Sequence, residues 1–200
     1  MARSLWVECV MNGHEAGYRG NPSLAVGKRY WVGGVVSVQG SALLVVDSEW
    51  GRPLLQEARF FGAMVGDVPQ GWKVSVWLDH EYPAEIAMGY PALVEGGMAR
   101  IVDLEEGEPD STATFLLEQF LARFVDLVDV TAEHLVGGAG GDLIALAELG
   151  ERELALENLE WSLASSGNNV SPSHWGEFEE LNQLGARLGL LLNGSEDLEA

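Results

Sequence analysis

The last third of the chain carries apolar residues at helical spacing. Leucines and other apolar residues recur every three or four positions in two runs, residues 143–163 and 178–188. A polar stretch separates the runs, and its last two residues, Ser171-Pro172, suit an N-cap followed by a first helical turn. The pattern predicts an antiparallel pair of helices, of about fifteen to twenty residues each, within residues 142–190.

A further helical pattern covers residues 112–128, and Ser111 is its predicted cap. The apolar positions of this segment spread over a broad arc, which predicts a helix that is buried on two sides. These positions are Leu116, Leu117, Phe120, Leu121, Phe124, Val125 and Val128.

The first sixty residues instead show short apolar runs separated by glycine turns. The runs recur at a spacing of about ten residues, which is typical of a small antiparallel barrel. They cover residues 5–12, 26–32, 35–38, 42–47 and 53–60, with Gly33-Gly34 as a break between the second and the third.

The middle of the chain is mixed. Residues 72–78 alternate between apolar and polar, which predicts a strand with Trp72, Val74, Val76 and Leu78 on one face. We expect a short helical turn at residues 84–89 and another short strand at residues 101–104. The acidic residues 105–110 are the predicted linker.

These elements predict an α+β fold, with a small antiparallel β-barrel-like N-terminal domain followed by a helical C-terminal domain. The predicted parts are residues 1–62, a mixed connecting segment at residues 63–110, and residues 111–200. The pattern leaves open whether the connecting segment belongs with the first part or the last.

Charge is distributed unevenly along the chain. The net charge is −20, from 11 basic and 31 acidic residues. Residues 1–62 hold six basic and five acidic residues (+1), so residues 63–200 hold five basic and 26 acidic residues (−21). Such a field disfavours nucleic-acid binding, because that depends on neutralising phosphates with Lys and Arg. It would attract a basic protein, although an acidic surface also simply keeps a protein in solution.

No constellation in the sequence predicts an enzyme, a metal site or a cofactor site. The four histidines lie in separate segments without metal-ligand spacing, and the single cysteine, Cys9, suits a buried strand position. His80 lies between Asp79 and Glu81, but adjacent residues of an extended chain point to opposite faces. The glycines at 137–141 lack the Lys-Ser/Thr of a phosphate loop and suit a hinge. No apolar run predicts a membrane span or a signal peptide, so we expect a cytoplasmic protein.

Two stretches resemble known families. Residues 142–190 resemble the MafI-type bacterial immunity proteins, through Gly150-Glu151 and the run Leu154-Ala-Leu-Glu-Asn-Leu159, a polar loop with Pro172, and a closing Glu-Glu-Leu…Leu-Gly-Leu. The extra pair Arg152-Glu153 and the long N-terminal extension depart from the compact members of that family. Residues 26–61 resemble the small SH3-like barrels of bacterial and phage proteins, through Val-Gly-Lys-Arg-Tyr-x-Val and a closing Ala-Arg-Phe-Phe.

The first resemblance implies a protein that binds and neutralises the toxic domain of a polymorphic toxin. A basic toxin domain, for example a nuclease, would suit the acidic field. The predicted contact surface combines loop carboxylates with the carboxylates and tryptophans of the C-terminal helices. It consists of Asp79, Glu81, Glu85, Glu105, Glu106, Glu157, Glu160, Trp161, Trp175, Glu177 and Glu180.

In the alternative arrangement both tryptophans of this set pack inside the helical pair. The alternative function is a non-enzymatic adaptor or regulatory protein. It would bind a peptide in a groove lined by Tyr30, Trp31 or Trp50, or it would mimic a nucleic acid. Salt dependence separates these functions, because binding through carboxylates weakens steeply as salt rises.

Overall fold

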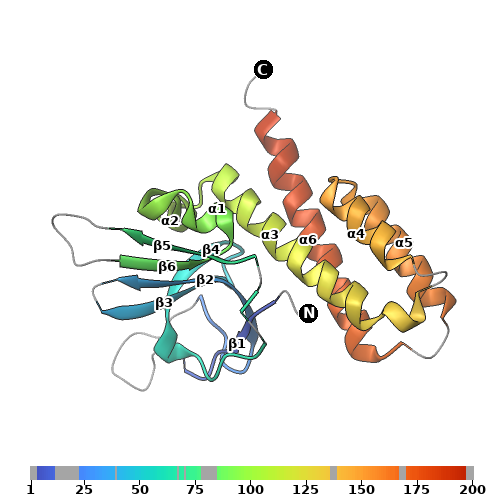
Figure 1. Cartoon of the computed structure of the whole chain (residues 1–200), viewed down its shortest axis with the longest axis horizontal. Helices are drawn as coiled ribbons and strands as arrows, with labels where there is room; N and C mark the ends of the chain where they lie inside the picture. Colours follow the sequence, from blue (N-terminus) through green and yellow to red (C-terminus); the bar gives the residue numbers. More distant parts are fainter. Residues whose placement is uncertain are drawn as a thin grey trace. The chain divides into compact units, whose positions relative to one another are not determined.

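The computed structural model describes residues 4–11, 23–38, 40–66, 68–69, 71–77, 85–135, 139–166 and 170–196. The chain forms two compact units (Figure 1). The sheet unit comprises residues 2–115 and the helical unit comprises residues 116–200. The α+β class predicted from the sequence is therefore correct.

The sheet unit is built on a six-stranded antiparallel sheet with the order β4-β3-β2-β6-β5, in which β1 also pairs with β2. The strands are β1 (Trp6–Glu8), β2 (Arg29–Val38), β3 (Ser41–Asp47), β4 (Pro53–Glu57), β5 (Lys73–Trp77) and β6 (Glu85–Gly89). A 3-10 turn, η2 (Ala58–Phe60), follows β4, and the helices α1 (Pro91–Val94) and α2 (Gly97–Glu106) follow β6.

This sheet has two edges, β4 and β5, and no ladder between described residues closes it into a barrel. The chain that follows β4 nevertheless returns to β1 and to the residue after it, through two isolated bridges, Trp6 to Val65 and Cys9 to Phe61. Strand β6 pairs with β2, so residues 73–89 belong to the same sheet as residues 29–57.

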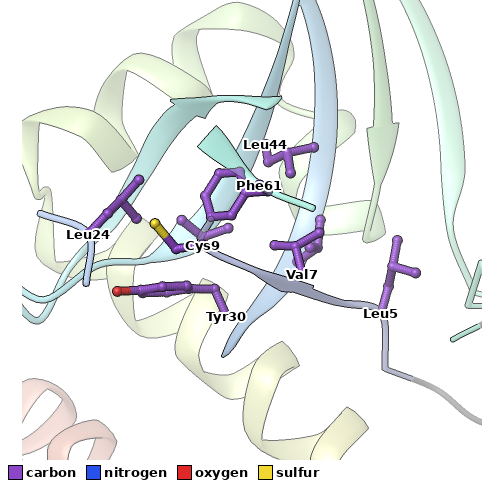
Figure 2. Packing of buried hydrophobic residues seen from close by; sticks show 9 residues of the cluster. Leu5, Val7, Cys9, Leu24, Tyr30, Leu44 and Phe61 are labelled. Atoms are coloured by element: carbon purple, nitrogen blue, oxygen red, sulfur yellow. The ribbon is translucent and has the colours of Figure 1, made fainter. Parts of the chain in front are cut away.

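Both faces of the sheet bury apolar side chains. On one face, α1 and α2 pack against β4, β5 and β6 and cover Val36, Val45 and Ala87. On the other face, β1, Leu24 and Phe61 cover Leu44 and its neighbours, and Figure 2 shows this cluster. The predicted burial of Cys9 is confirmed there, since its thiol has no exposed surface.

Gly33 and Gly34, where the sequence predicts a break between two strands, are explained by close packing. Strand β2 runs through Gly33 and Gly34 with a shift in register, so the predicted break is wrong. A Cβ on Gly33 would lie 2.3 Å from the ring of Phe115, and one on Gly34 would lie 2.2 Å from Leu93. The missing side chains therefore let helical residues approach the strand.

Three predictions in the middle of the chain are wrong. Residues 85–89 form β6 instead of a helical turn, because their backbone completes ladders with β2 and β5. Residues 101–104 lie in α2 instead of a strand, with Ile101 and Leu104 buried. The predicted linker is divided between the end of α2 and the start of the next helix, which meet at the left-handed Gly107.

The helix α3 (Pro109–Val130) contains the boundary between the two units. Its broad apolar arc is buried as predicted, with Leu116, Phe120 and Phe124 fully buried. The predicted cap is wrong, because the helix begins at Pro109. Ser111 lies inside the first turn, where its hydroxyl accepts a hydrogen bond from Arg100 (2.5 Å).

The helical unit continues with η3 (Ala132–His134), α4 (Gly140–Glu148), α5 (Arg152–Ser165) and α6 (Pro172–Glu196) (Figure 1). The first of the two predicted helices is in fact two, α4 and α5. Gly150 adopts a left-handed φ of 91°, and the N–H of Glu151 donates to the carbonyl of Leu146 (3.0 Å), which ends α4. The predicted N-cap of α6 is confirmed, since Ser171 Oγ accepts from the N–H of His174 (3.3 Å).

The close approach of the paired strands β2 and β6 at Gly89 provides a test of this packing. A Cβ on Gly89 would lie 2.8 Å from the carbonyl oxygen of Gly33 and 3.0 Å from the Cα of Gly34, and neither backbone can move freely. We expect Gly89→Ala to destabilise the sheet unit by about 1–3 kcal/mol, the usual cost of overpacking. Urea unfolding followed by tryptophan fluorescence measures this loss. Gly71→Ala is the matched control, because its added Cβ meets nothing within 4 Å, and an equal loss in both variants would contradict the packing argument.

Candidate partner-binding surface

The outer face of α5 exposes a tryptophan among carboxylates. The buried side of the helix includes Leu156, Leu159 and Leu163, whereas Trp161 is 62% exposed. Trp161 lies two residues from both Leu159 and Leu163, which is about 200° around a helix of 3.6 residues per turn. The same rotation places Leu154, Glu157 and Trp161 within about 60° of one another. We call Leu154, Glu157, Glu160 and Trp161 the α5 face, and all four side chains are exposed.

The α5 face holds like charges close together. Glu157 lies four residues after Glu153 and three before Glu160, and these spacings make their side chains neighbours on a helix surface. Among the residues that the structure describes, no ion pair neutralises Glu157 or Glu160. Each like-charge pair at such spacing costs roughly 0.2–0.5 kcal/mol in an isolated helix. The folded chain therefore carries an unfavourable arrangement on α5 that a cationic partner would relieve.

The predicted α6 carboxylates have a different environment. Glu177 and Glu180 accept hydrogen bonds from Arg123 of α3 at 2.7 and 2.5 Å, and the Arg123 side chain is only 6% exposed. Burial alone would lower the pKa of Arg123, but the two carboxylates raise it above the ordinary value. The structure thus uses both glutamates to join α3 to α6.

The second predicted tryptophan of the helical unit is less accessible. Trp175 is half-buried, and its ring meets Phe178 edge to face at 5.9 Å. Of the two predicted anchors, Trp161 is therefore the more available to a partner.

The remaining predicted residues lie in the sheet unit. Glu105 and Glu106 are exposed at the end of α2. Glu85 starts β6, but only its backbone is described. Asp79 and Glu81, like His80, lie outside the described residues.

The predicted aromatic groove of the adaptor alternative is mostly core. Tyr30 and Trp31 are almost fully buried, and only Trp50, at 55%, is exposed. The Tyr30 hydroxyl donates to Glu49 (2.7 Å) and accepts from the N–H of Ala25 (2.7 Å). Burial is the main reason that the pKa of Tyr30 is raised. Tyr30 and Trp31 are therefore structural residues.

Sequence reasoning missed two exposed apolar sites. Leu154 was not among the predicted contacts, although it lies two helical turns before Trp161 and so on the same face. In the sheet unit, Val74 and Val76 of β5 are 64% and 56% exposed, and they face Met88 and Ile86 of β6 across the ladder. The sequence predicts the alternation of apolar and polar residues in β5. It does not show whether another element packs over Val74 and Val76, because that depends on tertiary structure.

Among the residues with defined placement, no group of three or more His, Cys, Asp and Glu side chains could hold a metal ion. Burial raises the pKa of the Cys9 thiol. None of the helices in the described part of the chain combines the length and apolar character needed to cross a membrane.

Comparison of the chain with protein-family models, curated protein sequences and solved structures finds no match. The two family resemblances therefore stay predictions that rest on the quoted residues.

One carboxylate of α3 gives a prediction about pH. Glu118 is half-buried, and burial raises its pKa above the ordinary value. A raised pKa means that the folded state resists ionisation of this group, so its contribution to stability falls as the pH rises through the raised value. We expect Glu118→Gln to be more stable than the parent at pH 7. This advantage should shrink as the pH falls toward the ordinary glutamate pKa of about 4.3.

Urea unfolding at several pH values, from 7 down to about 5, measures this difference. Glu148→Gln, which changes an exposed glutamate of the same unit, is the control. An advantage that is independent of pH would contradict the assignment to burial of the Glu118 charge.

Proposed function

We propose that this chain is a non-enzymatic immunity-type protein that binds a basic bacterial toxin domain through the α5 face and thereby blocks it. The observation that carries the proposal is the exposure of Trp161 beside Glu157 and Glu160. Tryptophan is enriched among the residues that dominate binding energy at protein interfaces. A large exposed indole next to carboxylates, on the side of α5 opposite its buried leucines, favours a role in contact over a role in folding.

Charge supports a basic partner. The helical unit, residues 116–200, contains 16 acidic residues and three arginines, a net charge of −13. Arg123 is buried in its pairs with Glu177 and Glu180 and adds little to the surface. Complementary fields speed association and select against acidic competitors. A nuclease domain would fit, because its own substrate requires a basic surface.

The resemblance of residues 142–190 to MafI-type proteins supports the immunity role in particular. We expect the protein to act in the cytoplasm, and a single buried cysteine suits that reducing compartment.

We also propose that the β1–β4 part of the sheet unit is an incomplete SH3-like barrel. The support is the return of residues 61–65 to β1 through the two isolated bridges. Such a fold by itself implies no activity.

The test is co-purification of this chain with the protein encoded immediately upstream of its gene, at low and at high salt. We expect a complex that weakens as salt rises, together with protection of cells from that protein. Glu157→Gln/Glu160→Gln should weaken the complex at low salt by at least about tenfold, since close interfacial charge pairs couple by about 1.5 kcal/mol or more. It should not destabilise the fold, because it removes like-charge repulsion.

The matched control is Glu105→Gln/Glu106→Gln, which removes the same charge from an exposed site of the sheet unit. If both double variants weaken binding equally, net charge matters but the α5 face does not. If no complex forms at either salt concentration, the immunity proposal fails.

A second candidate function is binding of an extended peptide by the sheet unit. It is favoured by β5, an edge strand whose Val74 and Val76 are exposed. A peptide can add to such an edge through main-chain hydrogen bonds. A complex that resists salt, survives the α5 variants and is lost in Val76→Asp would support this candidate instead.

A further inference from the structure

Two tryptophan rings of the sheet unit, half-buried Trp6 and exposed Trp50, each have an arginine of the chain close to the ring. The guanidinium of Arg52 lies 5.8 Å from the ring centre of Trp50, and that of Arg29 lies 5.0 Å from Trp6. These distances are within the range of cation–π attraction. Trp50 and Trp161 have similar exposure, so Trp50 serves as a comparison within the same chain: it is an exposed indole with an arginine close to its ring.

Trp161 is the exception. Within the part of the chain that the structure describes, no cation and no second ring lies against its indole. One of its neighbours at helical spacing, Glu157, is a carboxylate, and Glu160 precedes it in the sequence. The helix α5 contains only one basic residue, Arg152, nine positions away from Trp161. The α5 face thus has both components that attract a cation, an open π face and negative charge, without a cation of its own.

The spacing of these components suits one side chain in particular. Glu157 lies four residues before Trp161, so the two side chains are neighbours, with Cβ atoms about 5–6 Å apart. A guanidinium is planar, so it can stack on an indole while its edge donates two hydrogen bonds to a carboxylate. A lysine ammonium is a point charge and cannot make both contacts with the same geometry.

We propose that Trp161 and Glu157 form a binding site for an arginine of the basic partner. Leu154, three residues before Glu157 on α5, adds an apolar contact. The arginine lies over the ring of Trp161 as Arg52 lies over the ring of Trp50, but it is supplied by the partner. This inference rests on the proposed function and names the chemistry of the contact. The occupant follows from charge complementarity, because Glu157 is a neighbour of Trp161 on the helix and α5 also carries Glu153 and Glu160, and none of the three has a counter-charge among the described residues.

The first experiment uses simple probes. Hexa-arginine and hexa-lysine peptides are titrated into the full chain at low salt, and the indole N–H signals are followed by NMR. Trp161→Phe and Trp50→Phe assign the two signals. We expect hexa-arginine to shift the Trp161 signal and to bind this site more tightly than hexa-lysine. The Trp50 signal should stay unchanged, because Arg52 already lies over that ring and adds a like charge that repels the peptide.

Variants locate the contact. Glu157→Gln should weaken hexa-arginine binding at Trp161 by roughly two- to fivefold, whereas Glu106→Gln, at an exposed site of the sheet unit, should not. The inference is overturned if the two peptides bind Trp161 equally, if Trp50 responds as Trp161 does, or if both glutamate variants behave alike.

The second experiment uses the complex with the upstream-encoded protein. Trp161→Ala should weaken it strongly and Trp161→Phe less, with the melting temperature of the free chain unchanged in both. A salt-sensitive complex that is indifferent to Trp161→Ala overturns this inference and leaves the proposed function standing. Absence of any complex overturns the proposed function, and the peptide titration then decides alone whether the site recognises arginine.

Discussion

Burial of one charge, the guanidinium of Arg123, constrains the helical unit. A buried cation is tolerated only where carboxylates and hydrogen bonds compensate for its lost hydration. Glu177 and Glu180 provide that compensation from α6, and the pairs fix the position of α6 against α3. The stacked rings of Phe120 and Phe124 occupy the core of the same unit. An arrangement of α3 and α6 that lost these ion pairs would leave Arg123 buried without a partner.

This constraint divides the acidic residues into two kinds. Those on α6 that face Arg123 are neutralised within the fold and contribute to its stability. Those on α5 have no such partner among the described residues, and they repel one another at helical spacing. Unpaired carboxylates beside an exposed tryptophan are typical of a binding surface, and the α5 face has both. The two exposed indoles differ in the same way, since Trp50 of the sheet unit has Arg52 over its ring and Trp161 has no such cation among the described residues.

The spacing of apolar residues correctly predicted those helices and strands that are determined by their local sequence. The helices α3 and α6 have long apolar stripes, and β3 and β5 are short apolar or alternating runs. The errors fall where distant contacts decide. Residues 85–89 have no strong local preference and became a strand because β2 and β5 pair with them.

The candidate surface was only partly predictable. Glu157, Glu160 and Trp161 were named from charge and composition, and the position of Trp161 opposite Leu159 could have been read from helical rotation. The pairing of Glu177 and Glu180 with Arg123 could not, because it joins residues more than fifty positions apart.

The most direct test of the central claim is carboxyl footprinting of this chain, free and in complex with the upstream-encoded protein. A water-soluble carbodiimide activates exposed carboxylates, an added small amine in excess converts them to amides with release of the urea, and mass spectrometry reports the extent at each site. We expect complex formation to protect Glu157 and Glu160 on α5, while Glu105 and Glu106 on α2 stay labelled. Unchanged labelling of Glu157 and Glu160 in a formed complex would contradict it, and would place the interface elsewhere on the chain.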